Sequence, residues 1–160
     1  MLARNSLVAA VLFASSAYAD PTQAPDFHRY SVPVYAGPRA APDFAGPGKQ
    51  YLTYRTVIRD GFLHNPITAG HFTIISAGCG AGCILYWYGE LHTGRIATFP
   101  IGGENYPGLT LSTNPGSRLV VAKWDDPQSG ACTSRSYLLR GAQFFREGSD
   151  RTMRKSCEDI

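Results

Sequence analysis

The sequence has little net charge and no long apolar segment. Its formal net charge is +3 over 160 residues, which is too small to indicate binding to nucleic acid or to an anionic membrane. The apolar run at residues 6–14 is about half as long as the roughly 20 residues that a membrane-spanning helix needs. We therefore expect no nucleic-acid partner and no membrane span.

Several motifs that would indicate a particular chemistry are also missing. No glycine-rich fingerprint stands between a strand-like and a helix-like segment, so a nucleotide-binding α/β fold has no support. Neither a G-x-S-x-G nucleophile elbow nor an H-E-x-x-H zinc motif occurs. We expect no cofactor.

Residues 1–19 have the features of a secretory signal peptide. Arg4 supplies the positive start, residues 6–14 the short apolar region, and Ala17-Tyr18-Ala19 an A-x-A cleavage site. The residue directly after this site is Asp20 rather than a cysteine, which argues against a bacterial lipid anchor. Cleavage would lower the net charge to about +2. The prediction is a periplasmic or secreted protein.

Residues 20–49 are rich in proline, glycine and alanine and are predicted to form a flexible leader. Proline fixes φ and removes a hydrogen-bond donor, so a regular strand ladder is not expected, except for one short edge strand at residues 30–35. An extended or disordered leader and a partner-binding arm in polyproline conformation are both open. The prolines are Pro21, Pro25, Pro33, Pro38, Pro42 and Pro47.

Residues 50–63 have the apolar spacing of a short helix. Tyr51, Tyr54 and Val57 recur on one helical face, and Asp60-Gly61 is a plausible stop. Arg55 and Arg59 are four apart and would share another face. They are candidates for an anion site or for an ordinary solvated face.

The remainder of the chain predicts a single β-rich domain, residues 50–160. Short β-branched or aromatic runs alternate with glycine- and proline-containing turns, which is typical of an antiparallel meander. We expect a β-rich α+β fold, with about seven strands as a sandwich or a partial barrel and one short N-terminal helix. The strands are expected at residues 71–77, 84–88, 95–99, 109–113, 118–124, 136–140 and 143–146.

The loop at residues 78–83 concentrates glycine and cysteine between two predicted strands. Cys79 and Cys83 are close enough in sequence for a bridge across a tight reversal. Three interpretations are open: a structural disulfide, a redox-active pair, and a metal site that adds His71 or His92. The spacing is C-x-x-x-C rather than the C-x-x-C of redox enzymes. No C-x-x-C or H-x-x-x-H occurs elsewhere in the sequence to support a metal site.

Three segments together resemble a family of small secreted bacterial proteins. They are residues 54–59 (Y-R-T-V-I-R), 68–75 (T-A-G-H-F-T-I-I) and 78–83 (G-C-G-A-G-C). The family's hallmark is an F-A-G-H-Y segment, a strand, and a W-G-C-G-x-x-C loop followed by a strand and a T-G turn. This chain departs from the hallmark at Thr68 and Ala77, which stand where the family has Phe and Trp. The likeness covers roughly residues 54–100, with a weaker echo at 136–145, and implies export and a fold style but no activity.

Four cysteines in an exported chain predict two disulfides, for which three connectivities exist. We favour Cys79–Cys83 with Cys132–Cys157, because the first pair is local and the family that the chain resembles carries it. The second bridge would attach the C-terminal tail to the body of the domain.

Catalysis has candidate residues but no convergent pattern. His71 would be either a packed histidine or a ligand or acid/base group, and Cys79 could meet it across a hairpin as a nucleophile. The other acid/base candidates are mostly in predicted loops or at strand ends: Asp60, Glu90, Glu104, Asp125, Asp126, His64 and His92.

Binding through aromatic side chains is the other functional hypothesis. Trp87 and Tyr88 are consecutive on a strand and so face opposite sides, where an exposed ring could stack on a sugar or anchor a protein. A strand buried on both faces is the alternative.

The sequence as a whole therefore predicts a non-catalytic binding module with no bound metal. Its partner would be an envelope protein, which it would bind or inhibit, or a cell-wall component. A small thiol-disulfide or other enzyme using Cys79, Cys83 and His71 is the alternative. The binding candidates are Arg55, Arg59, His71, Trp87 and Tyr88.

Overall fold

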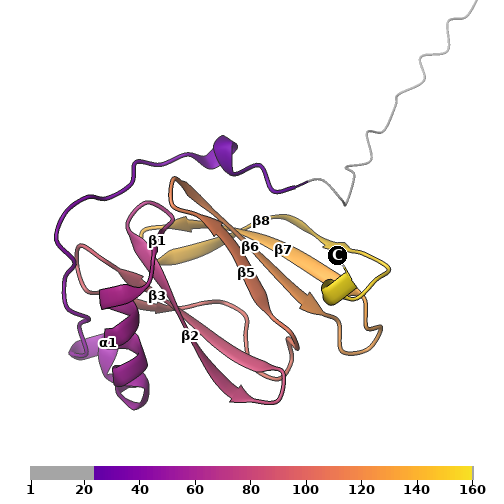
Figure 1. Cartoon of the computed structure of the whole chain (residues 1–160), viewed down its shortest axis with the longest axis horizontal. Helices are drawn as coiled ribbons and strands as arrows, with labels where there is room; N and C mark the ends of the chain where they lie inside the picture. The colour runs from indigo at the N-terminus through magenta and orange to yellow at the C-terminus, as the bar shows by residue number, and fades with distance from the viewer. Residues whose placement is uncertain (1–23, 160) are drawn as a thin grey trace, which may run out of the picture.

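The computed structural model describes residues 24–159, so the predicted signal peptide and the first residues of the predicted leader lie outside it. Two four-stranded antiparallel sheets make up the domain, and each is a simple meander (Figure 1). The first contains β1 (Ile67–Thr68), β2 (Phe72–Gly80), β3 (Cys83–Glu90) and β4 (Ile96–Thr98). The second contains β5 (Thr110–Asn114), β6 (Ser117–Asp125), β7 (Cys132–Arg140) and β8 (Gln143–Thr152).

This architecture confirms the predicted β-rich fold class, with differences in strand number and length. The additional strand is the two-residue β1, which pairs with the start of β2. β8 continues to Thr152, beyond the strand predicted at residues 143–146. Its polar residues are compatible with an edge strand, because β8 has one strand neighbour and all its positions are exposed or half-buried.

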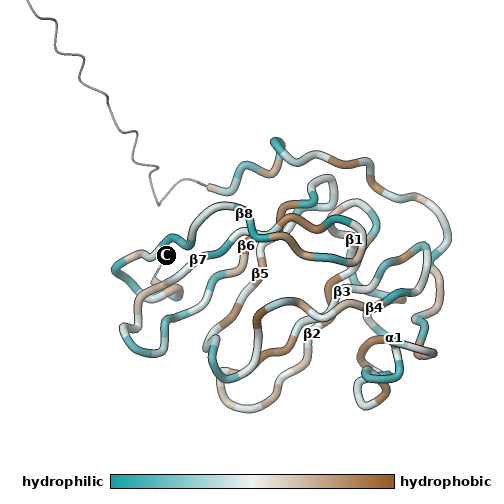
Figure 2. The backbone as a smooth tube through the Cα atoms, turned by 180° about the vertical axis from the view of Figure 1, so that it is seen from behind, coloured by the Kyte–Doolittle hydropathy of each residue, from teal (hydrophilic) through white to brown (hydrophobic). Residues whose placement is uncertain are grey.

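The main core lies between the two sheets. Phe72 and Tyr88 from the first sheet pack in one cluster with Val120 and Leu139 from the second. In Figure 2 the described residues that follow β8 are mostly hydrophilic, whereas strongly apolar residues occur along the strands. The apolar side chains that the two sheets direct toward each other thus build a sandwich.

The outer face of the first sheet is covered by helical structure. A 3₁₀ segment, η2 (Gly46–Tyr54), leads into α1 (Arg55–His64), and Ile58 and Phe62 of α1 pack against Ile75 and Trp87. The predicted helix is confirmed over most of its length, but Asp60-Gly61 does not end it. Gly61 packs directly against Ile75, and the helix ends only before Asn65, which is extended as the residue preceding Pro66.

The described part of the predicted leader is irregular, as its prolines indicate, but it is hydrogen-bonded to the domain rather than free. The amides of Val32, Tyr35 and Ala40 donate to carbonyls of the two sheets' turns. Arg39 donates from Nη1 to the carbonyls of Phe62 (2.8 Å) and other residues at the end of α1. The predicted edge strand is reduced to a single bridge between Ser31 and Ser117, flanked by the short 3₁₀ segment η1 (Phe27–Tyr30).

Both predicted disulfides are present. Cys79 pairs with Cys83 across the β2–β3 turn, and Cys132 pairs with Cys157 beyond the end of β8. Within residues 24–159, no helix has the length and hydrophobicity needed to cross a membrane.

Candidate ligand-binding cavity

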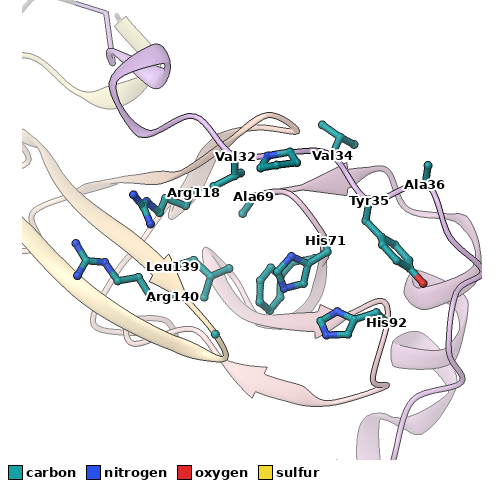
Figure 3. Close-up of a pocket in the computed structure, with 13 residues that line it drawn as sticks. Val32, Val34, Tyr35, Ala36, Ala69, His71, His92, Arg118, Leu139 and Arg140 are labelled. Carbon is teal, nitrogen blue, oxygen red and sulfur yellow. The ribbon is translucent and has the colours of Figure 1, made fainter.

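A cavity of about 800 Å³ lies where the N-terminal segment crosses the ends of the two sheets. Its walls come from the segment around Val32, the start of β2, the β3–β4 turn, β6 and the β7–β8 turn (Figure 3). Val32, Ala69, Phe72 and Leu139 provide apolar surface. The basic lining residues are His71, His92, Arg118 and Arg140.

The N-terminal wall of the cavity depends on the close approach of two backbones. Tyr35 donates its amide to the Gly70 carbonyl (2.8 Å), and Val32 donates to Gly116 (2.9 Å). A Cβ on Gly70 would lie 3.0 Å from the Pro33 carbonyl oxygen, and Gly70 has a φ of +87°. Both conditions favour glycine, so this position lets residues 32–36 lie over the entrance to β2.

His71, Glu90 and His92 converge at one end of this cavity. His71 Nε2 is 3.4 Å from Glu90 Oε1, and His92 Nε2 is 4.0 Å from the same oxygen. The two imidazole rings are 4.7 Å apart between centroids and meet edge to face. The Glu90 side chain is only 7% exposed, whereas His71 and His92 are 35% and 42% exposed. A buried carboxylate therefore faces two half-exposed imidazoles.

The hairpin register explains this convergence. Phe72 pairs with Glu90, so His71 and Leu91 lie opposite each other just beyond the ladder, where Leu91 donates its amide to the His71 carbonyl (2.8 Å). The β3–β4 turn then returns the chain, because the amides of Thr93 and Gly94 both donate to the Glu90 carbonyl. Thr93 Oγ1 donates to Glu90 Oε2, which leaves Oε1 directed at the two histidines.

Arg118 lies at the other end of the cavity, together with Arg140 (Figure 3). In β6 it shares the parity of Val120 and Ala122, which belong to the core between the sheets. Its Nε atom is buried and makes no hydrogen bond to any described residue. The Arg140 guanidinium instead lies over the Phe145 ring, 5.7 Å from its centroid. Arg118 is thus the cation of this cavity with a buried donor that lacks a hydrogen-bond partner among the described residues.

Two of the predicted binding residues lie in the core. Trp87 is 3% exposed and Tyr88 is 0% exposed, so the strand is buried on both faces and neither ring presents a surface for stacking on a ligand. Burial raises the pKa of the Tyr88 phenol well above its usual range, which keeps the hydroxyl neutral. The helical segments cover one face of this strand and the second sheet covers the other. The residues of the strand itself do not indicate that either neighbour is present.

The predicted arginine pair lies on α1, away from the cavity lining. Arg55 and Arg59 are both exposed, and the Arg59 guanidinium lies over the Phe44 ring at 5.7 Å. Of the five predicted binding residues, only His71 lines the cavity.

The structure separates the cysteines from the histidines. His71 precedes β2, whereas Cys79 is near the far end of that strand, next to the Gly80–Cys83 pair that closes the hairpin. At about 3.3 Å per residue, the two α-carbons lie roughly 25 Å apart. The predicted meeting of Cys79 with His71, as nucleophile and base or as metal ligands, is therefore wrong.

No protein-family model matches the chain, and the searches find no similar curated protein and no similar solved structure. The resemblance to small secreted bacterial proteins is not tested by these comparisons and stays a prediction.

Arg118 was not among the residues predicted from the sequence, whereas Glu90 and His92 were. Glu90 and His92 were acid/base candidates without a defined neighbour, and the hairpin register supplies that neighbour. The position of Arg118 in the strand was the available signal. Arg118 lies two residues before Val120 and four before Ala122, so the three side chains share one face of the strand.

Proposed function

We propose that this protein is an exported, non-catalytic binding module that holds a small organic anion with an apolar body in this cavity. One observation carries the proposal: the lining combines two arginines, two histidines and apolar side chains, and the one carboxylate described at its edge, Glu90, faces the two histidines rather than the arginines. A cavity of this volume falls within the range of roughly 300–1,000 Å³ that is usual for small-molecule sites.

The apolar part of the ligand would lie against Val32, Phe72 and Leu139. Phe72 and Leu139 are buried members of the core, so a ligand at this position would extend the core outward. Removal of apolar surface from water contributes about 25 cal/mol per Å² to such binding. This part of the site gives affinity with little selectivity.

The acidic group of the ligand would bind Arg118. A guanidinium with a buried donor that lacks a partner is costly, and a carboxylate can accept from it in a charge-assisted hydrogen bond. Among the described residues, no carboxylate lies within ion-pairing distance of Arg118. The anion would supply the acceptor that the protein itself does not provide.

The test is isothermal titration calorimetry of the purified, oxidised protein in EDTA, with dodecanoate and dodecanol as probes. We expect dodecanoate to bind more tightly than dodecanol. Arg118→Met should weaken dodecanoate binding about 10- to 100-fold, since a hydrogen bond to a charged group is worth about 1.5–3 kcal/mol. Arg118→Met keeps most of the aliphatic stem, so the apolar wall of the cavity is retained.

Arg55→Met is the matched control, because Arg55 is an exposed arginine of α1 outside the cavity. It should leave dodecanoate affinity unchanged. Equal affinities for the acid and the alcohol, or an unchanged affinity in Arg118→Met, would contradict the proposal. A loss in Arg55→Met instead would indicate the anion site predicted on the helix.

Compartment and partner belong to the same proposal. The two disulfides are compatible with an oxidising compartment, and the ligand would be a component of the bacterial envelope or of the extracellular medium. An envelope protein or cell-wall component that presents an acidic apolar group would be the macromolecular form of the same ligand.

A thiol-disulfide activity is the alternative, and fewer observations support it. Cys79 and Cys83 lie at a strand-to-strand turn, without the helix N-terminus that lowers a thiol pKa in redox enzymes. We expect glutathione titration with peptide mapping to give a Cys79–Cys83 reduction potential below about −300 mV, typical of a structural bridge. A value between about −200 and −120 mV would favour the redox activity instead.

A further inference from the structure

We infer that His71, Glu90 and His92 form a binding site for a divalent transition-metal ion, with Zn²⁺ as the ion that the donor set fits best. The three residues each offer one donor atom, and these atoms all lie within 4.8 Å of one another. The inference is independent of the anion proposed above, since it rests on different atoms at the opposite end of the cavity.

The distances are close to those that a zinc ion requires. Zn–N and Zn–O bonds are about 2.0–2.2 Å, so neighbouring donors of a tetrahedral site lie roughly 3.4 Å apart. His71 Nε2 is already 3.4 Å from Glu90 Oε1, and His92 Nε2 is 4.0 Å from it. To bind the ion, His92 Nε2 would have to move closer to Glu90 Oε1. The His92 side chain is 42% exposed and lies in a turn, which leaves room for this movement.

The surrounding contacts orient the carboxylate as a metal ligand needs. Thr93 Oγ1 donates to Glu90 Oε2 and so leaves Oε1 as the free donor. Such hydrogen bonds to the ligand's other atom fix its direction and raise metal affinity. His71 is held in turn by its backbone bond to Leu91 and by stacking on Phe72, with ring centroids 4.3 Å apart.

The donor types select the class of metal. Two imidazole nitrogens and one carboxylate oxygen suit Zn²⁺ and related first-row divalent ions, whereas Ca²⁺ and Mg²⁺ prefer oxygen-only sites and Cu⁺ prefers sulfur. Three protein ligands leave a fourth position open. Because both histidines line the cavity, that position would face the cavity and be available to water or to a ligand.

The experiment is a Zn²⁺ titration of the purified, oxidised protein after removal of metal with EDTA and exhaustive dialysis. Calorimetry in the presence of a competing chelator should show one equivalent of Zn²⁺ bound. His92→Gln, His71→Gln and the isosteric Glu90→Gln should each weaken the affinity at least 100-fold. Thr93→Val should weaken it about 10- to 100-fold, which is the usual effect of removing an outer-shell hydrogen bond.

His64→Gln is the matched control. His64 is the other histidine with a nearby carboxylate, 2.9 Å from Asp60, but both groups are largely exposed and no third donor adjoins them within the described chain. This variant should bind Zn²⁺ as the unmodified protein does. Circular dichroism and the melting temperature of each variant establish that it folds, and His92→Gln, at an exposed position, is the variant least prone to misfold.

A spectroscopic readout separates a defined site from loose surface binding. Substitution with Co²⁺ should give visible d–d absorption bands typical of four-coordinate cobalt, and these bands should disappear in His92→Gln but persist in His64→Gln. An absence of stoichiometric Zn²⁺ binding would overturn the inference. So would an affinity that does not change in His71→Gln and His92→Gln.

Discussion

Replacement of Phe62 by alanine is expected to lower the free energy of unfolding by about 3–5 kcal/mol, the usual cost of truncating a buried Phe. Phe62 is 1% exposed and belongs to the cluster that joins α1 to the outer face of the first sheet. Its ring lies directly over Gly89 in β3, where an added Cβ would lie 2.2 Å from Phe62 Cε2. Urea denaturation followed by circular dichroism measures the effect.

The contact between Phe62 and Gly89 can be tested by a double-mutant cycle. Gly89→Ala alone should cost about 1–3 kcal/mol, because the added methyl group overpacks the contact. In a Phe62→Ala background the ring is gone, so the same substitution should cost well under 1 kcal/mol, which gives a coupling energy between the two positions. If Phe62→Ala leaves too little stability to measure, Phe62→Leu serves as the background.

Gly78→Ala in β2 is the control for the glycine substitution. No atom outside its immediate neighbours lies within 4 Å of a Cβ built at Gly78, so this change should alter stability by no more than about 0.5 kcal/mol. Equal costs for Gly78→Ala and Gly89→Ala, or a Gly89→Ala cost that is unchanged without the ring, would contradict the packing described here.

Removal of the Cys132–Cys157 disulfide is the second change with a large expected effect. The double variant Cys132→Ala/Cys157→Ala should lose about 3 kcal/mol, since the bridge closes a loop with a sequence separation of 25. The bridge stands next to the end of β8, where Cys132 also donates its amide to the Lys155 carbonyl and accepts from the Met153 amide. Thermal and urea denaturation of the oxidised and the variant protein give the difference.

The other disulfide provides the matched comparison. Cys79 and Cys83 are separated by only four positions, so loop entropy predicts a smaller loss, about 2 kcal/mol, for Cys79→Ala/Cys83→Ala. If the local bridge proves the more stabilising of the two, chain entropy does not dominate, and contacts around the β2–β3 turn must account for the difference.

The predictions from sequence succeeded where short-range patterns decide the structure. The alternation at residues 109–113, the apolar run within residues 118–124 and the turn residues Asn114-Pro115-Gly116 between them favour a β-hairpin, and β5 and β6 form one. The apolar spacing of residues 50–63 likewise gave a helix. The predicted stop at Asp60-Gly61 was wrong, because Gly61 packs against Ile75 of β2 inside the helix. The residues around Gly61 alone do not reveal this contact with a strand that follows later in the chain.

The candidate site was predicted only in fragments for the same reason. His71 was singled out, and Glu90 and His92 were noted as unconnected acid/base candidates. Their convergence requires the register that pairs Phe72 with Glu90, and a shift by one residue would turn these side chains to the other face. Trp87 and Tyr88 failed as surface residues because two different neighbours cover the two faces of β3.

Local chemistry in the chain therefore determined the β-rich class and the position of most strands, because strand alternation and turn residues act over a few residues, and the four cysteines indicated two disulfides. Tertiary structure alone decided which side chains share a cavity. Arg118, His71 and His92 come from separate strands and turns, and the segment around Val32 that closes over them is held by hydrogen bonds to Gly116 and Gly70. Such contacts depend on how two sheets and an N-terminal segment pack together, and no periodicity within any one of these segments encodes that arrangement.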